Sequence, residues 1–125
     1  MRLLLDTHIF LWAVAGSRLL KPAARRLIES ADEVHVSAAS IWEIAIKARL
    51  GKVEAAPDEL TAAIDASGFV QLPVSATHAA GVVRLPLHHN DPFDRLLIAQ
   101  ALAEPLRFVT ADAALAPYTE LVVLV

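Results

Sequence analysis

The chain has 125 residues, of which 56% are hydrophobic and 20% are charged, so it is long and apolar enough to bury a core, which argues against disorder. The 11 Lys and Arg residues against 14 Asp and Glu give a net charge of −3, so any contact with nucleic acid depends on local basic patches or metal ions. Cys is absent, which excludes disulfides, thiolate nucleophiles and Cys-ligated zinc and fits a cytoplasmic protein.

The run Leu3 to Leu5 begins the chain and leads directly into Asp6. A short apolar run without alternation is typical of a strand that is covered on both faces, as in a parallel sheet. Ligands of such sheets bind beyond the carboxyl ends of the strands, where Asp6 is expected to lie. Capping of the following helix explains Asp6 equally well when this residue is taken alone.

Strands and helices alternate along the rest of the chain. In chain order we expect a strand at Leu3–Leu5, helices at Thr7–Ala15 and Ala23–Ser30, a strand at Val34–Val36, helices at Ala38–Leu50 and Asp58–Ser67, a strand at Phe69–Leu72, helices at Ser75–Arg84 and Asp91–Ala103, a strand at Arg107–Val109, a short helix and a strand at Leu121–Leu124. This order predicts one α/β domain over residues 1–125. It is expected to be a three-layer α/β/α sandwich with a mostly parallel sheet of about five short strands.

Two further acids fall at the same edge of the predicted sheet as Asp6. Asp112 follows a strand, and Asp94 lies in the first turn of a helix. Apolar residues three, four and seven positions after Asp94 place it on the side of that helix that faces the sheet. Because neighbouring carboxylates repel one another, three of them at one edge favour a hard cation such as Mg²⁺ or Mn²⁺.

The acidic residues also fit ordinary structural roles. Asp91 fits a helix cap, and Asp94 and Asp112 each fit an acid in the first turn of a helix. Glu43 lies opposite the apolar stripe of its helix and four residues before Lys47, so spacing alone predicts a surface residue. Taken together, the acids at one sheet edge still favour a shared site.

Other sites of catalysis find little support in the sequence. The histidines lack the spacing of a zinc site, and His88 and His89 fit a loop pair, either purely structural or near a substrate. Neither a Gly-rich phosphate loop nor a nucleophile elbow is present. A basic cluster fits either a solvated helix face or a phosphate contact; it consists of Arg18, Lys21, Arg25 and Arg26.

Four segments resemble the PIN-domain family, in particular the VapC-type toxins of bacterial toxin–antitoxin pairs. They are Leu4–His8 with the first acid, Ser37–Ile44 with the second, Asn90–Ala101 with the third and Thr110–Asp112 with the fourth. The resemblance covers essentially the whole chain and implies a PIN-like fold and a metal-dependent ribonuclease. It also implies that Glu43 belongs to the site, against its position on the helical wheel.

The resemblance implies catalytic and metal-binding roles for Asp6, Glu43, Asp94 and Asp112, with Mg²⁺ or Mn²⁺ as cofactor. Asp6 and Asp94 are the expected direct ligands, while Glu43 and Asp112 are expected to bind a second ion or to deprotonate the attacking water. Hydroxyl groups expected to support these acids belong to Thr7, Ser40 and Thr110. The side chains expected to contact RNA, each of which also fits a solvated surface, are Lys47, Arg49, Lys52 and Arg95.

A protein partner is implied in the same way. Toxins of this family are held inactive by a cognate antitoxin, whose C-terminal segment docks near the site and often inserts a basic side chain among the acids. Phe10, Trp12 and Ile46 are expected to line that groove. The resemblance also implies a homodimer.

Three other classes compete with a nuclease. A receiver-type phosphotransfer domain needs an acidic pair after the first strand and a late Lys, whereas this chain has Asp6 alone and no Lys after Lys52. A haloacid-dehalogenase-type phosphatase needs a second Asp where His8 stands. A non-catalytic acidic domain that binds proteins stays open, and RNA cleavage that is lost with EDTA would separate it from a nuclease.

Overall fold

The computed structural model describes residues 1–125, and its strands and helices alternate as the sequence predicts. The strands are β1 (Arg2–Leu5), β2 (Glu33–Ser37), β3 (Val70–Leu72), β4 (Arg107–Thr110) and β5 (Val122–Leu124). The α-helices are α1 (Thr7–Ala15), α2 (Pro22–Ser30), α3 (Ala38–Arg49), α4 (Pro57–Ala66), α5 (Ala76–Gly81) and α6 (Pro92–Ala103). Two 3₁₀ helices, η1 (Val82–Arg84) and η2 (Ala113–Tyr118), complete the chain.

The five strands form one sheet in the order β3-β2-β1-β4-β5, and every neighbouring pair is parallel. The central strand is β1, in which Leu4 pairs with His35 on one side and with Phe108 on the other. The expected α/β fold around a parallel sheet is therefore confirmed. Because all strands run the same way, all their carboxyl ends lie at one edge of the sheet.

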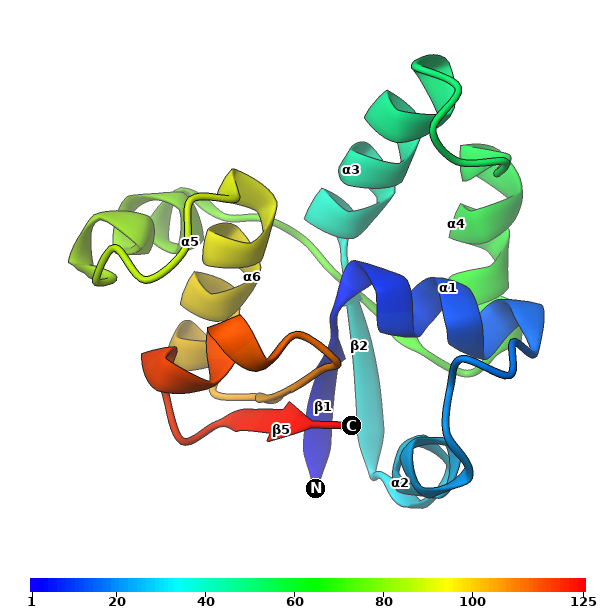
Figure 1. Ribbon diagram of the computed structural model, residues 1–125, viewed down its shortest axis with the longest axis horizontal. Helices are drawn as coiled ribbons and strands as arrows, with labels where there is room; N and C mark the ends of the chain where they lie inside the picture. Colours follow the sequence, from blue (N-terminus) through cyan, green and yellow to red (C-terminus); the bar gives the residue numbers. More distant parts are fainter.

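Helices cover both faces of the sheet (Figure 1). Successive side chains of a strand point to opposite faces. Leu3 and Leu5 accordingly pack in a core with residues of α1, α2 and α4, whereas Leu4 packs in a second core with residues of α6. All three leucines are fully buried. The uninterrupted apolar run at the start of the chain thus reflects a strand that is covered on both sides.

Three helices begin at the carboxyl edge of the sheet. A single residue, Asp6, separates β1 from α1, and α3 follows β2 directly, with the Ser37 hydroxyl accepting a hydrogen bond from the Ala39 N–H. Asp91 caps α6 by accepting from the N–H groups of Phe93 and Asp94. In Figure 1, α3 continues past this edge and stands opposite the start of α6. The polar residues of these three helix starts are brought together here.

The helix expected over Ser75–Arg84 is divided into α5 and η1. Ser75 and His78 form a capping box that starts α5. Further on, the Val82 carbonyl accepts from the Leu85 N–H, three residues later, and from the Arg95 side chain. These bonds take the carbonyl away from the regular α-helical pattern and tighten the last turn into a 3₁₀ helix. None of the helices combines the length and apolar character that crossing a membrane requires.

Candidate active site

Asp6 is buried at the end of β1, where its two carboxylate oxygens have different donors. Oδ1 accepts from the Thr7 N–H at 2.7 Å, and Oδ2 accepts from the Thr110 hydroxyl at 2.6 Å. The residue therefore caps α1 and also stands at the expected edge of the sheet. Burial raises the pKa of Asp6, and the Glu43 charge adds to that rise, against the lowering effect of the two hydrogen bonds.

Glu43 is only 4% exposed, so the surface position expected from the helical wheel is wrong. The start of α1 covers that side of α3, where the Thr7 hydroxyl donates to Glu43 Oε1 at 2.8 Å. Lys47, one turn later, donates to Oε2 at 2.6 Å and neutralises the buried charge. Hydrogen bonding to Glu43 raises the pKa of Lys47, and the charges of Asp91 and Asp94 also favour its protonated form.

Asp94 lies in the first turn of α6, half-buried and surrounded by other acids. Burial, followed by the charges of Asp6 and Asp91, raises the pKa of Asp94 to about 7. A hydrogen bond of 3.0 Å to His89 Nε2 lowers that pKa without offsetting the rise. The groups around Asp94 thus do not offset the burial of its carboxylate and the negative charge of the neighbouring acids.

Asp112 completes the group at the end of β4. Its Oδ1 accepts from the Ala114 N–H at 2.9 Å and so caps η2, while its Oδ2 lies 4.0 Å from His89 Nε2. Single ligand atoms of His89, Asp94 and Asp112 all lie within 4.8 Å of one another. His89 has no recognisable ligand spacing, so the sequence predicts a loop residue near the substrate but not a side chain in contact with the acids. The position of His89 in the sequence is one signal for this contact, because a residue five positions before Asp94 lies in the loop that leads into α6.

Thr7 and Thr110 connect three of the four acids, Asp6, Glu43 and Asp112. Thr7 Oγ1 lies 2.9 Å from Ser40 Oγ and donates to Glu43, while its backbone N–H donates to Asp6. Thr110 Oγ1 donates to Asp6 and accepts from the Asp112 N–H at 3.1 Å. All three hydroxyl residues are buried. Thr7 and Thr110 therefore orient the carboxylates of Asp6 and Glu43, and Ser40 in turn contacts Thr7.

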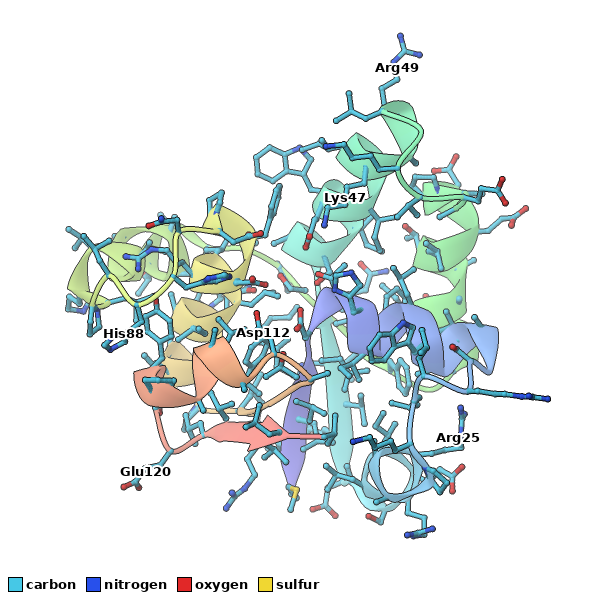
Figure 2. The ribbon with its side chains drawn as sticks, viewed as in Figure 1. Arg25, Lys47, Arg49, His88, Asp112 and Glu120 are labelled. Carbon is cyan, nitrogen blue, oxygen red and sulfur yellow. The ribbon has the colours of Figure 1, made fainter.

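The side chains expected to contact RNA are not grouped. Figure 2 shows Lys47 pointing from α3 toward the sheet edge, whereas Arg49 points outward at the far end of the helix. Lys52 is exposed just beyond that end. Arg25, of the basic cluster, lies by α2 and away from Asp112 (Figure 2). Of these four, Lys47 alone hydrogen-bonds to an acid of the site.

Arg95 requires a correction, because its guanidinium faces inward and is not available to phosphate. The residue is 9% exposed. It donates to the backbone carbonyls of Pro86 at 2.8 Å, Val82 at 3.3 Å, Leu85 at 3.3 Å and His89 at 3.5 Å, and to the Tyr118 hydroxyl at 3.1 Å. These bonds hold the loop before α6. One residue after Asp94, the helix has turned this side chain from the site toward that loop.

The groove expected for a protein partner also requires a correction. Phe10 is fully buried in the core and lines no groove, whereas Trp12 is half-buried and Ile46 is at the surface. A hollow of about 390 Å³ does lie between α1 and α4. Its lining is mostly apolar, with two acids at its border: Leu11, Val14, Ala15, Glu54, Ala55, Ala56, Glu59, Leu60 and Ala63.

The donors at the sheet edge fit a divalent cation. Asp6, Glu43, Asp94 and Asp112 offer carboxylate oxygens, which hard cations such as Mg²⁺ and Mn²⁺ prefer. Lys47 is the one cationic side chain that hydrogen-bonds to any of them, and the raised pKa of Asp94 reflects an excess of negative charge. A bound cation would remove that excess.

Comparisons with known proteins agree with this arrangement. A model of the PIN domain matches residues 3–121. The chain is 35% identical over 111 residues to ribonuclease VapC22 of Mycobacterium tuberculosis (strain ATCC 25618 / H37Rv). The aligned region covers 87% of this chain and 85% of that protein.

Two solved structures share the fold. A chain of a toxin–antitoxin complex from Klebsiella pneumoniae is 19% identical, with a TM-score of 0.69 over 97% of this chain and 95% of that one. A chain of VapBC2 from Rickettsia felis, solved bound to a DNA fragment from its promoter, is 17% identical, with a TM-score of 0.69 over 99% of this chain and 97% of that one.

Proposed function

The chain belongs to the PIN-domain family, and on that premise we propose that it is a cytoplasmic endoribonuclease that depends on a divalent cation and serves as the toxin of a toxin–antitoxin pair. The family resemblance expected from the four acidic segments is confirmed. The relative from Mycobacterium tuberculosis is named a ribonuclease, which supports the same activity here.

One observation carries the proposal: four acids that are far apart in the sequence meet at the carboxyl edge of a parallel sheet. Thr7 contacts both Asp6 and Glu43, and His89 lies between Asp94 and Asp112. A group of acids kept at such a cost in charge repulsion is typical of a functional site. A non-catalytic binding domain gives no reason to bury Glu43 and Asp6 beside one another.

The reaction is hydrolysis of an RNA phosphodiester. The oxygen of a water molecule forms a bond to phosphorus in line with the bond from phosphorus to the leaving ribose oxygen, which breaks. Asp6 and Asp94 are the proposed cation ligands, and Glu43 and Asp112 bind a second cation or accept the proton that the water loses. When bound, Mg²⁺ or Mn²⁺ supplies positive charge that offsets the negative charge developing on the phosphate oxygens.

Lys47 is the proposed contact to the phosphate backbone of the substrate. It is the cationic side chain that hydrogen-bonds to the site, and it is partly exposed. With few basic groups near the acids, the protein has little general affinity for duplex backbone. We therefore propose a single-stranded segment or loop as the substrate, because proteins usually read RNA where its bases are unstacked.

The inhibitory partner is a cognate antitoxin, and we propose that it occupies the hollow between α1 and α4. The hollow offers apolar surface for a helix or extended segment, while Glu54 and Glu59 at its border favour a segment that carries basic residues. We further propose a homodimer, as the resemblance implies. Exposed apolar side chains such as Trp42, which is 60% exposed, supply surface for such a contact.

The proposal is tested with purified protein and a labelled single-stranded RNA. Cleavage is expected with Mg²⁺ or Mn²⁺ and is expected to cease with EDTA. Asp6→Asn and Asp94→Asn are expected to abolish cleavage while keeping the fold, which circular dichroism verifies. Glu120→Gln is the matched control, since its side chain points away from the site (Figure 2). Full cleavage by Asp6→Asn would reject the assignment.

A further inference from the structure

His89 occupies a place that the acidic site alone does not require. Its ring nitrogen Nε2 lies 3.0 Å from Asp94 Oδ2 and 4.0 Å from Asp112 Oδ2. The histidine comes from the loop before α6, whereas the two acids come from the start of α6 and the end of β4. Three separate parts of the chain thus present one nitrogen and two carboxylate groups to a common point.

The separations between these atoms match those of ligands around one metal ion. With metal–ligand bonds of about 2.1 Å in octahedral geometry, neighbouring ligands are about 3.0 Å apart and opposite ones about 4.2 Å apart. The two distances from His89 correspond to these two values. The three ligand atoms also lie within 4.8 Å of one another, so no large movement is needed to enclose an ion.

The loop that carries His89 is hydrogen-bonded to the elements that carry the two acids. The His89 carbonyl accepts from the Tyr118 hydroxyl at 3.3 Å and lies 3.5 Å from Arg95 Nη1. Arg95 directly follows Asp94 in α6, and Tyr118 ends the 3₁₀ helix that Asp112 caps. The backbone of His89 is therefore held beside both acids before any ion binds, and its Nε2 already lies 3.0 Å from Asp94 Oδ2.

His88 provides an internal comparison. It packs edge-to-face on the Tyr118 ring, with ring centroids 5.0 Å apart, and its side chain points away from Asp112 (Figure 2). Neighbouring histidines thus have different surroundings: one supports the loop from outside, and the other faces the acids.

We propose that His89 is a direct ligand of the second cation, which it binds together with Asp112 and Asp94, so that this position prefers Mn²⁺ to Mg²⁺. This inference rests on the proposed function and extends it. Mg²⁺ takes oxygen ligands and gives up its water reluctantly, whereas imidazole nitrogen suits first-row transition metals. A nitrogen ligand in an otherwise carboxylate site therefore shifts selectivity toward Mn²⁺.

Electron spin resonance of bound Mn²⁺ tests the proposal without any reaction. The wild-type protein, loaded with Mn²⁺, is expected to show ¹⁴N modulation of the spin echo from a directly bound imidazole. His89→Gln is expected to lose that modulation and to bind Mn²⁺ at least about tenfold more weakly, with a smaller loss for Mg²⁺ measured by competition. His88→Gln is the matched control and is expected to keep both the modulation and the affinity.

Three results would overturn the proposal: bound Mn²⁺ without ¹⁴N modulation in the wild type, no Mn²⁺ binding at all, or an unchanged preference for Mn²⁺ over Mg²⁺ in His89→Gln. RNA cleavage by the wild type and by Asp6→Asn tests the proposed nuclease activity separately. A wild-type protein that cleaves RNA with Mg²⁺ and binds Mn²⁺ through oxygen alone would retain the proposed function while rejecting His89 as a ligand.

Discussion

The Thr110 hydroxyl donates a hydrogen bond of 2.6 Å to Asp6 Oδ2, across a separation of 104 residues in the sequence. The two residues end or follow neighbouring parallel strands, β4 and β1, so the register of the sheet sets their contact. The same hydroxyl accepts from the Asp112 N–H. One buried side chain thus orients the first acid and the backbone of the last.

Replacing Thr110 by Val removes this hydrogen bond while keeping the shape of the side chain. Since the bond lowers the pKa of Asp6, its loss raises that pKa further, and a cation must then displace a more tightly held proton. Mn²⁺ affinity is expected to fall more at pH 6 than at pH 8, measured by calorimetry. Thr110→Ser, which keeps the hydroxyl, is expected to match the wild type. Equal losses at both pH values would contradict this role.

Asp94 makes the stability of the metal-free protein depend on pH. Its pKa is about 7 in the folded protein and about 3.9 in an unfolded chain. Between these values the folded state holds a proton that the unfolded state has released, so this group's contribution to stability is full below about pH 4 and is lost as the pH rises through 7. The Asp94→Asn variant has no carboxyl group to titrate at this position, so its stability does not fall in this way as the pH rises.

The free energy of unfolding in urea, measured with a chelator present, tests this effect. The advantage of Asp94→Asn over the wild type is expected to grow from pH 4.5 to pH 8, and saturating Mn²⁺ is expected to cancel it. A difference between the two proteins that stays constant over that range would show that Asp94 titrates normally.

The fold was predictable because its signals are local. The apolar run Leu3–Leu5, and the caps and breakers at the helix ends, mark the elements well, and alternation along the chain implies a parallel sheet. Asp6, Asp94 and Asp112 follow from the same logic, because each lies where an element begins or ends. Their convergence depends only on the direction of the strands.

The remainder of the site depends on contacts that spacing does not encode. Glu43 is buried because α1 covers the outer side of α3. A helical wheel considers one helix alone and so cannot show that another helix packs against this side. The contacts of Arg95 and His89 were not encoded in spacing for the same reason. The position of the loop before α6 directs the arginine inward and the histidine toward the acids. Only the family resemblance identified Glu43.

Lys47 neutralises Glu43, and its removal is expected to destabilise the metal-free protein. Lys47→Gln leaves a buried carboxylate oxygen without its charged donor, at a cost of about 1–2 kcal/mol in the free energy of unfolding. Added Mn²⁺ is expected to recover part of that cost. Arg49→Gln, at the far end of the same helix, is expected to stay within about 0.5 kcal/mol of the wild type. Equal stabilities of the two variants would show that the pair contributes nothing.

Arg95 is expected to act on stability, not on RNA affinity. Arg95→Met removes donors from several buried carbonyls of the loop before α6, so the free energy of unfolding is expected to fall by about 2–4 kcal/mol. Arg95→Lys keeps the charge but not the planar fork and is expected to be intermediate. Chemical denaturation measures both. A variant of normal stability with a raised KM for RNA would instead support a phosphate contact.

The hollow between α1 and α4 yields a prediction about the partner. If a basic segment of an antitoxin binds there, reversing the acids at its border weakens the complex, chiefly by slowing association. Glu54→Lys combined with Glu59→Lys is expected to lower affinity about three- to tenfold at low salt and less at high salt, because screening already weakens these contacts. Both side chains are exposed, so the fold is expected to be unaffected.

The probe is a synthetic amphipathic peptide with an apolar face and a basic edge, and surface plasmon resonance gives both rate constants. Glu120→Lys is the control, because it reverses one exposed charge at the opposite side of the molecule (Figure 2). If the double variant and the control bind the probe equally, the hollow is not the contact. In that case the exposed apolar surface around Trp42 becomes the place to test next, since a partner that ignores the charges of Glu54 and Glu59 has to bind elsewhere.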